Sequence, residues 1–168
     1  MLPTGFNPTG GTGAADCEPT KAYYDEKLLV GYRWYAAHPE VEPAFAFGHG
    51  LSYTSFNYSN LAIYHGRANP NPTVAFDVTN NGSVAGAEVA QLYLEFPASA
   101  GEPPIQLKGF EKVTLAAGAT ATVTFALEDR AFSIWDVELH AWHKVLGSFG
   151  VSVGASSRDV RLTGSTTL

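Results

Sequence analysis

The stretch Thr73–Phe96, TVAFDVTNNGSVAGAEVAQLYLEF, carries the pattern of two β-strands joined by a turn. In its first part apolar residues alternate with small or polar ones, which is typical of a strand with one buried face; they are Val74, Phe76 and Val78. Asn80-Asn81-Gly82-Ser83 follows and is a strong turn signal. The apolar run 87–96 then predicts a second strand.

Similar strand patterns recur along the chain, and Pro, Gly and Ser-rich turns separate them. They cover residues 56–64, 105–115, 120–127, 149–153 and 159–162, and 105–115 is predicted to be a strand pair with a kink at Gly109. About seven short strands and no helix of ordinary length predict an all-β, Greek-key sandwich. We expect it to span residues 56–168, after an irregular N-terminal extension over residues 1–55 whose first twenty residues are rich in Gly and Pro.

A junction, residues 28–53, has no regular period of helix or strand. Its sequence is LLVGYRWYAAHPEVEPAFAFGHGLSY, with aromatic residues on both sides of a single arginine, Arg33. Gly48 and Gly50 bracket His49, so we expect a backbone with positive φ or a close approach to a neighbour there. The apolar side chains of the junction would be exposed in an isolated module. We therefore expect either self-association through residues 28–53 or folding of this stretch across the face of the sandwich.

The composition narrows the class of protein. The chain has 168 residues, of which 45% are hydrophobic and 15% charged, so it can form a real core. Its net charge is −6 and its basic residues are dispersed, which argues against nucleic acid as a partner. No apolar run is long enough to span a membrane. Cys17 is the only cysteine, so neither an internal disulfide nor a thiolate zinc site is expected. Residues 1–16 show no signal-peptide pattern, and the compartment stays open.

The order of motifs resembles a known family. The segments 24–35 (YDEKLLVGYRWY) and 45–56 (FAFGHGLSYTSF) are similar to the junction near the C-terminus of glycoside hydrolase family 3 β-glucosidases. The segment 78–93 (VTNNGSVAGAEVAQLY) resembles the opening strands of that family's fibronectin type III-like domain. Residues 107–113, 132–135 and 153–159 fit later positions of the same domain, so the resemblance covers roughly residues 20–163.

This resemblance implies a fibronectin type III-like β-sandwich without catalytic domains. In the family, a barrel domain supplies the aspartate nucleophile and an α/β domain supplies the acid/base, and both lie upstream of the matched region. The chain is therefore expected to be an accessory module that stabilises a partner domain or contacts glycans, and the resemblance is compatible with secretion. Ala36 and Ala46 depart from the family pattern, which usually has an acidic residue and a proline at these positions.

The alternative is a minimal stand-alone glycoside hydrolase acting on β-glucosides. Glycoside hydrolysis requires two carboxyl groups that flank the scissile bond. Asp136 and Glu138 are expected to share one face of a strand beside an aromatic patch, and Asp25 with Glu26 is a second candidate pair. A solvated hairpin tip or surface charge is the competing interpretation of both pairs. No cofactor is expected.

The candidate residues for binding a β-linked oligosaccharide or glucoside form two groups, one in the junction and one close to Asp136 and Glu138 in sequence. They are Trp142, His140, His143, Trp34 and Arg33. Flat tryptophan faces suit pyranose rings, but Trp34 and Trp135 are more simply explained as filling the core or covering its end. Arg33 is expected to stack on an aromatic ring and to pair with a carboxylate. His140, His143 and Asp136 have a spacing that suits one face of a helix, whereas this region reads as a hairpin, so no metal site is predicted.

Overall fold

The computed structural model describes residues 24–66 and 71–168. Cys17 and the Gly/Pro-rich segment 1–20 lie outside the described residues. Among those described, no helix combines the length and the hydropathy that a membrane span needs.

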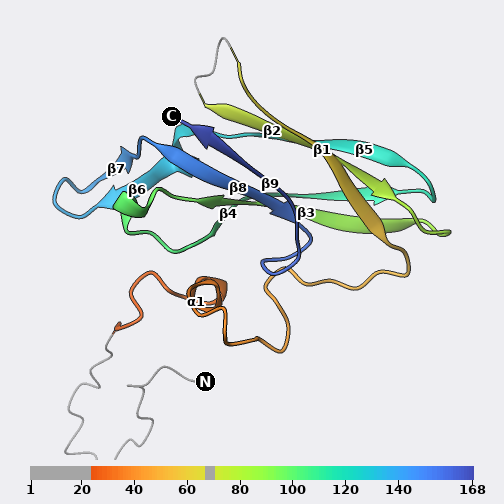
Figure 1. Ribbon diagram of the computed structural model, residues 1–168, viewed down its shortest axis with the longest axis horizontal. Coiled ribbons are helices and arrows are strands. Elements are labelled where there is room, and N and C mark those ends of the chain that lie inside the picture. Colours follow the sequence, from red (N-terminus) through yellow and green to blue (C-terminus); the bar gives the residue numbers. More distant parts are fainter. Residues whose placement is uncertain (1–23, 67–70) are drawn as a thin grey trace, which may run out of the picture.

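Two antiparallel sheets face each other and form a β-sandwich (Figure 1). The three-stranded sheet has the order β1 (Phe56–His65), β2 (Pro72–Asn80), β5 (Thr120–Ala126). The four-stranded sheet has the order β4 (Gln106–Leu115), β3 (Gly86–Glu95), β8 (Ser148–Gly154), β9 (Val160–Thr167). The chain crosses between the sheets after β2, after β4 and, through the β6–β7 segment, after β5, as in a Greek-key sandwich. The predicted fold class is confirmed.

Smaller elements complete the described chain. A separate hairpin, β6 (Ser133–Asp136) and β7 (Ala141–Lys144), projects from one end of the sandwich, as Figure 1 shows. The helical elements are α1 (Tyr32–Ala37) and two short 3₁₀ turns, η1 (Ala98–Ala100) and η2 (Asp129–Phe132). The sandwich itself has seven strands, as predicted, and the hairpin brings the described residues to nine strands.

The strand pattern predicted for β2 matches its burial. Val74, Phe76 and Val78 are at most 1% exposed and point into the core. The turn after β2 joins strands of different sheets, because β2 pairs only with β1 and β5. Asn80 fixes this crossing: its buried side-chain amide donates hydrogen bonds to the carbonyl oxygens of Val84, at 2.8 Å, and Leu115, at 3.0 Å.

The prediction of a strand pair over 105–115 was wrong. This segment is the single strand β4, and Lys108 forms a bulge in it, since Leu92 pairs with Gly109 while Tyr93 pairs with Leu107. A bulge accommodates one extra residue without ending the strand. Gly109 is needed for another reason: a Cβ there would come within 2.8 Å of the Phe125 ring.

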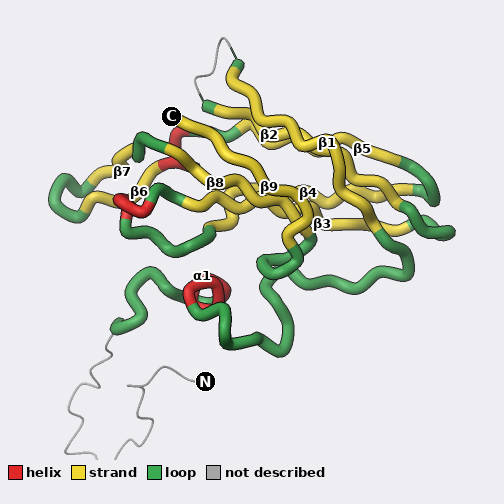
Figure 2. The backbone as a smooth tube through the Cα atoms, viewed as in Figure 1, coloured by secondary structure: helices red, strands yellow, loops and turns green. Residues whose placement is uncertain are grey.

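The junction lies along the outer face of the four-stranded sheet, where Figure 2 shows α1 and its flanking loops. Of the two arrangements expected for residues 28–53, folding across the sandwich is therefore the one observed. The sandwich begins with β1 at Phe56. The division of the chain into an extension, 1–55, and a sandwich domain, 56–168, stays a prediction.

Candidate docking interface

Tyr32 connects three parts of the interface between the junction and the sheet. Its ring stacks on Phe47 with centroids 4.6 Å apart and meets the ring of Tyr93 on β3 edge-on at 6.0 Å. Its hydroxyl accepts a hydrogen bond of 2.8 Å from the Leu107 backbone N–H, beside the β4 bulge. An edge strand leaves such donors without a ladder partner, so this hydroxyl caps the edge of the sheet.

Gln91 is a buried polar residue, 3% exposed, on the face of β3 that the junction covers. Its side-chain N–H groups donate to the Gly48 carbonyl at 3.1 Å and to the Ala155 carbonyl at 2.7 Å. Its side-chain oxygen accepts a 2.6 Å hydrogen bond from the Tyr93 hydroxyl. A buried amide is stable only when its donors and acceptor have partners, and here the junction supplies one of them.

The predicted glycine requirement is confirmed for Gly48 and wrong for Gly50. Gly48 has φ +81°, a value that residues with a side chain rarely adopt, and a Cβ there would overlap the Gln91 amide. At Gly50 a Cβ would meet no atom within 4 Å.

The turn between β8 and β9 holds the other side of the junction. The Ser157 N–H donates to the Phe47 carbonyl at 2.9 Å. The Arg158 guanidinium donates to the carbonyl oxygens of Tyr35 and Val41, each at 3.0 Å. One cation therefore ties the end of α1 to the loop that follows it.

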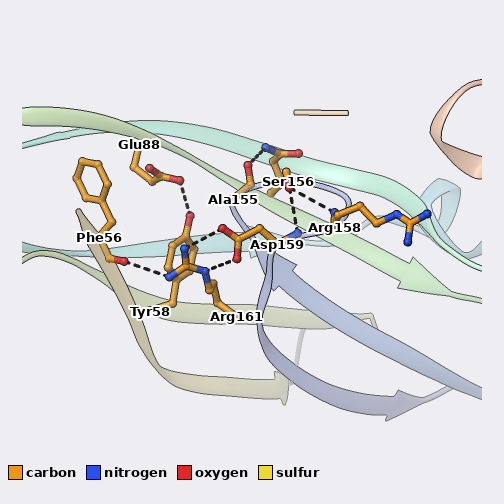
Figure 3. Close-up of polar contacts among 9 residues, drawn as sticks. Phe56, Tyr58, Glu88, Ala155, Ser156, Arg158, Asp159 and Arg161 are labelled. Atoms are coloured by element: carbon orange, nitrogen blue, oxygen red, sulfur yellow. Dashed lines mark hydrogen bonds and ion pairs between the residues drawn. The ribbon is translucent and has the colours of Figure 1, made fainter. Parts of the chain in front are cut away.

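A polar network lies next to these contacts (Figure 3). The Tyr58 hydroxyl donates to Glu88 at 3.0 Å, and Arg161 donates to both carboxylate oxygens of Asp159, at 2.5 and 2.8 Å. Burial raises the pKa of Glu88, whereas the hydrogen bonds from Arg161 lower the pKa of Asp159. The pKa of Tyr58 is raised by burial and by the neighbouring Glu88 carboxylate. The two carboxylates thus differ in which protonation state the fold favours.

The junction also presents an apolar rim to solvent. Six large apolar residues of the junction form this rim and are exposed to between 47% and 102%: Leu28, Val30, Phe45, Phe47, Leu51 and Tyr53. Contiguous exposed apolar surface marks an interaction site. The junction is therefore anchored to its own sheet and remains open to a second protein surface.

The structure places the predicted catalytic carboxylates in two exposed turns and at the end of a strand. Asp136 ends β6, and one of its carboxylate oxygens accepts 2.9 Å hydrogen bonds from the N–H groups of Glu138 and Leu139. Glu138 lies in the turn, so the expectation that the two share a strand face was wrong; an aspartate that bonds the following N–H groups favours a turn over further strand. Asp25 and Glu26 lie in an exposed turn before α1. A catalytic role for these four stays a prediction.

The predicted binding residues fall into two places. On the hairpin, Trp135 and Trp142 are cross-strand neighbours with rings edge to face at 5.3 Å, and they are 45% and 49% exposed. Trp135 therefore does not fill the core. His140 lies in the hairpin turn with φ +49°, and His143 on β7 is also exposed. Within the described residues, no three His, Cys, Asp or Glu side chains are grouped as metal ligands would be.

The other predicted residues lie on α1. Trp34 is half-buried and stacks on His38, with ring centroids 4.1 Å apart. The Arg33 guanidinium lies 5.8 Å from the centroid of the Tyr32 ring, as expected for stacking on an aromatic residue. The expected carboxylate partner is not found: the ion pairs among the described residues join other side chains, and the buried Nε of Arg33 has no hydrogen-bond partner there.

Sequence reasoning missed the residues that hold the junction: Gln91, Tyr93 and Arg158. Gln91 and Tyr93 were detectable in principle, since the run from Ala90 to Leu94 has one polar residue and no apolar–polar alternation, which is typical of a strand buried on both faces. Arg158 gives no such signal, because its acceptors are backbone carbonyls distant in sequence.

The comparisons with known proteins agree with this fold. Residues 88–157 match the fibronectin type III-like domain family. The probable β-glucosidase L of Aspergillus terreus is 47% identical, and the match covers 86% of this chain and 22% of that protein. The solved β-D-glucoside glucohydrolase of Trichoderma reesei matches with a TM-score of 0.80 and 38% identity, over 98% of this chain and 25% of that one.

A β-glucosidase of Streptomyces venezuelae, solved in complex with D-glucose, matches with a TM-score of 0.82 and 35% identity, over 90% of this chain and 20% of that one. This chain spans 22% of the length of its first curated relatives. The chain therefore corresponds to the C-terminal junction and fibronectin type III-like domain of glycoside hydrolase family 3 β-glucosidases, an accessory module and not their catalytic domains.

Proposed function

We propose that this module docks through the apolar rim of its junction onto the catalytic domains of a family 3 β-glucosidase and stabilises them. One observation carries the proposal: the junction is bonded on one side to the four-stranded sheet, yet six large apolar residues on it are 47% or more exposed. Burying such side chains against a partner contributes about 25 cal/mol per Å² of apolar surface.

The anchoring contacts support a docking role because they fix the rim before a partner arrives. Phe47 is both anchored and exposed: its ring stacks on Tyr32, and 47% of its surface remains exposed to solvent. A preorganised surface avoids part of the ordering cost of association. The relatives that match this chain extend far beyond it, which is consistent with a partner within the same family of proteins.

The test uses the β-glucosidase of Aspergillus terreus from which the region matching this chain has been deleted. We expect the purified chain to bind it and to raise its melting temperature, and we expect Leu51→Ser with Tyr53→Ser to abolish both effects. Tyr64→Ser is the matched control, since Tyr64 is 50% exposed on β1 of the three-stranded sheet, which the junction does not cover. Unaltered binding by the double variant would contradict the proposal, and so would a monomeric chain that binds nothing. Association of the chain with itself, lost in the same variant, would assign the rim to the second copy instead.

The stand-alone hydrolase stays a second prediction with a separate test. The purified chain is assayed on aryl β-glucosides and cello-oligosaccharides, alone and as Asp136→Asn, Glu138→Gln and Asp25→Asn. Turnover that these substitutions abolish would support the carboxylate assignment. Turnover no faster than in buffer would contradict an enzymatic role for the module, and unchanged turnover in all three variants would place the site elsewhere.

A further inference from the structure

A second surface feature lies beside the docking face. A cleft of about 820 Å³ opens between the junction, the β4 bulge and the β6–β7 hairpin. Three cationic side chains line it together with the two hairpin tryptophans; the cations are Arg33, Lys108 and Arg130. They come from three different elements, α1, β4 and η2, so only the folded module brings them together.

None of the three cations is neutralised by an ion pair within the described residues. The two ion pairs found there join Lys144 to Asp129 and Arg161 to Asp159. The Nε of Arg33 is buried and has no hydrogen-bond partner in residues 24–66 and 71–168. A buried donor without a partner destabilises the fold, and a charged one does so more strongly, so this site favours an incoming acceptor.

Lys108 and Arg130 contact aromatic rings and, like Arg33, have no ion-pair partner among the described residues. The Lys108 ammonium lies 4.9 Å from the centroid of the Phe96 ring, and the Arg130 guanidinium lies over the Trp142 ring. The pKa of Lys108 is lowered to about 8, chiefly by burial; Glu102 opposes this shift, and the positive charges of Arg33 and Arg130 add to it. Arg33 and Arg130 are therefore both close enough to Lys108 to disfavour its positive charge.

The acidic residues of the cleft do not balance these charges. Glu102 and Glu128 line it, and Glu102 already accepts a 2.5 Å hydrogen bond from the Gln106 side chain. Three cations against two carboxylates leave an excess of one positive charge, which one further carboxylate would neutralise. A carboxylate bound to a guanidinium forms one of the strongest polar contacts in proteins.

We propose that this cleft binds an aspartate or glutamate side chain of the protein onto which the module docks. The proposal rests on the proposed docking function and names a chemical feature of the partner. Leu28 belongs both to the cleft wall and to the exposed apolar rim, so the two surfaces are continuous. A partner seated on the rim therefore reaches the cleft, and a surface acidic residue supplies the missing charge.

The test titrates the full 168-residue chain with N-acetyl-tetraglutamate amide as the probe and follows the Arg33 Nε–H and Trp142 indole N–H signals by NMR. We expect saturable shifts of both. Lys108→Met and Arg130→Gln should each weaken binding about fivefold or more, which corresponds to losing one net hydrogen bond. Lys112→Gln is the matched control, since Lys112 is on the same strand but lines a different pocket.

Three results would overturn the proposal: no saturable shift, an equal loss of affinity in Lys112→Gln, or tighter binding of sodium glucuronate, which would assign the cleft to an acidic sugar. Arg130 is exposed, so Arg130→Gln keeps the test valid if Lys108→Met does not fold. Leu51→Ser with Tyr53→Ser is expected to bind the probe normally. Failure of docking and failure of carboxylate binding are thereby distinguished.

Discussion

The two sheets of the sandwich differ on their outer faces. On β2 of the three-stranded sheet, the inward residues are buried and the outward ones, such as Asp77 and Thr79, are partly exposed. On β3 of the four-stranded sheet, the outward residues Gln91 and Tyr93 are only 3% and 1% exposed. The difference arises because the junction covers one sheet and not the other, so it acts as a third layer of the fold.

The polar contacts on the two outer faces differ in the same way. Asp77 accepts hydrogen bonds from Asn60, at 2.8 Å, and from Thr122, at 2.6 Å, on the open face. These bonds lower the pKa of Asp77, but water competes for the same groups. Gln91 makes its bonds out of contact with water, where losing a partner leaves a buried group unsatisfied.

The largest expected effect comes from removing the tyrosine under the junction. Tyr93→Ala should lower the free energy of unfolding by about 3–5 kcal/mol, because it empties a buried aromatic site. Thr79→Ala, on the outward face of β2, should change it by less than about 0.5 kcal/mol. Denaturant unfolding measures both. Similar small losses in the two variants would mean that the junction does not cover the four-stranded sheet.

A smaller loss is expected where the junction touches Gln91. Gly48→Ala should cost about 1–3 kcal/mol, because it forces alanine into a left-handed conformation against the Gln91 amide. Gly50→Ala has open space around its Cβ and no such conformation, so it should cost less. Equal unfolding midpoints for the two alanine variants would contradict the close approach at Gly48.

The guanidinium contacts of Arg158 should affect the junction more than the sandwich. Arg158→Met is expected to cost about 0.5–1.5 kcal/mol per hydrogen bond lost, and the cost should appear as faster proteolysis within residues 35–53. Lys112→Met serves as the control because Lys112 is exposed on β4. If cleavage rates match in both variants, Arg158 does not hold the loop.

The smallest expected effect is on how the free energy of unfolding depends on pH. Because burial raises the folded-state pKa of Glu88 above 4.5, its contribution to stability is fully present below about pH 4.5 and is lost as pH rises through the folded pKa. Glu88→Gln should remove this loss. Asp159→Asn should act in the opposite sense, since the stability from the lowered pKa of Asp159 is present above pH 3.8 and is lost as pH falls through the folded pKa.

Unfolding measured from pH 3 to pH 8 tests both slopes. The stability of the parent chain relative to Glu88→Gln should fall as pH rises, whereas its stability relative to Asp159→Asn should rise with pH. Parallel curves for Glu88→Gln and the parent would show that burial at Glu88 does not perturb its titration.

The sandwich was predictable because local pattern determines it. The alternation of Val74, Phe76 and Val78 reports which face of β2 is buried, and the fold follows from repeating such patterns. The bulge at Lys108 and the hairpin turn that removes Glu138 from the strand were not predictable, because turn and bulge positions depend on cross-strand register.

The candidate interface was predictable only in part. The aromatic and glycine composition of residues 28–53 indicated a packed segment, and the structure places it on the four-stranded sheet. Which residues receive it could not be read from the chain, since Gln91 and Arg158 contact carbonyls of residues 43 and more than 100 positions away. The cationic cleft likewise unites residues from three separate elements.

Hydrogen exchange of the chain alone and with the truncated β-glucosidase tests the central claim most directly. The account predicts slow exchange of the Leu107 and Ser157 amides in the free chain, because Tyr32 and Phe47 hold them. It also predicts that exchange over residues 45–53 slows when the partner binds. Fast exchange at Leu107 and Ser157 in the free chain would contradict the anchored junction, and unchanged exchange over residues 45–53 on binding would contradict docking through the rim.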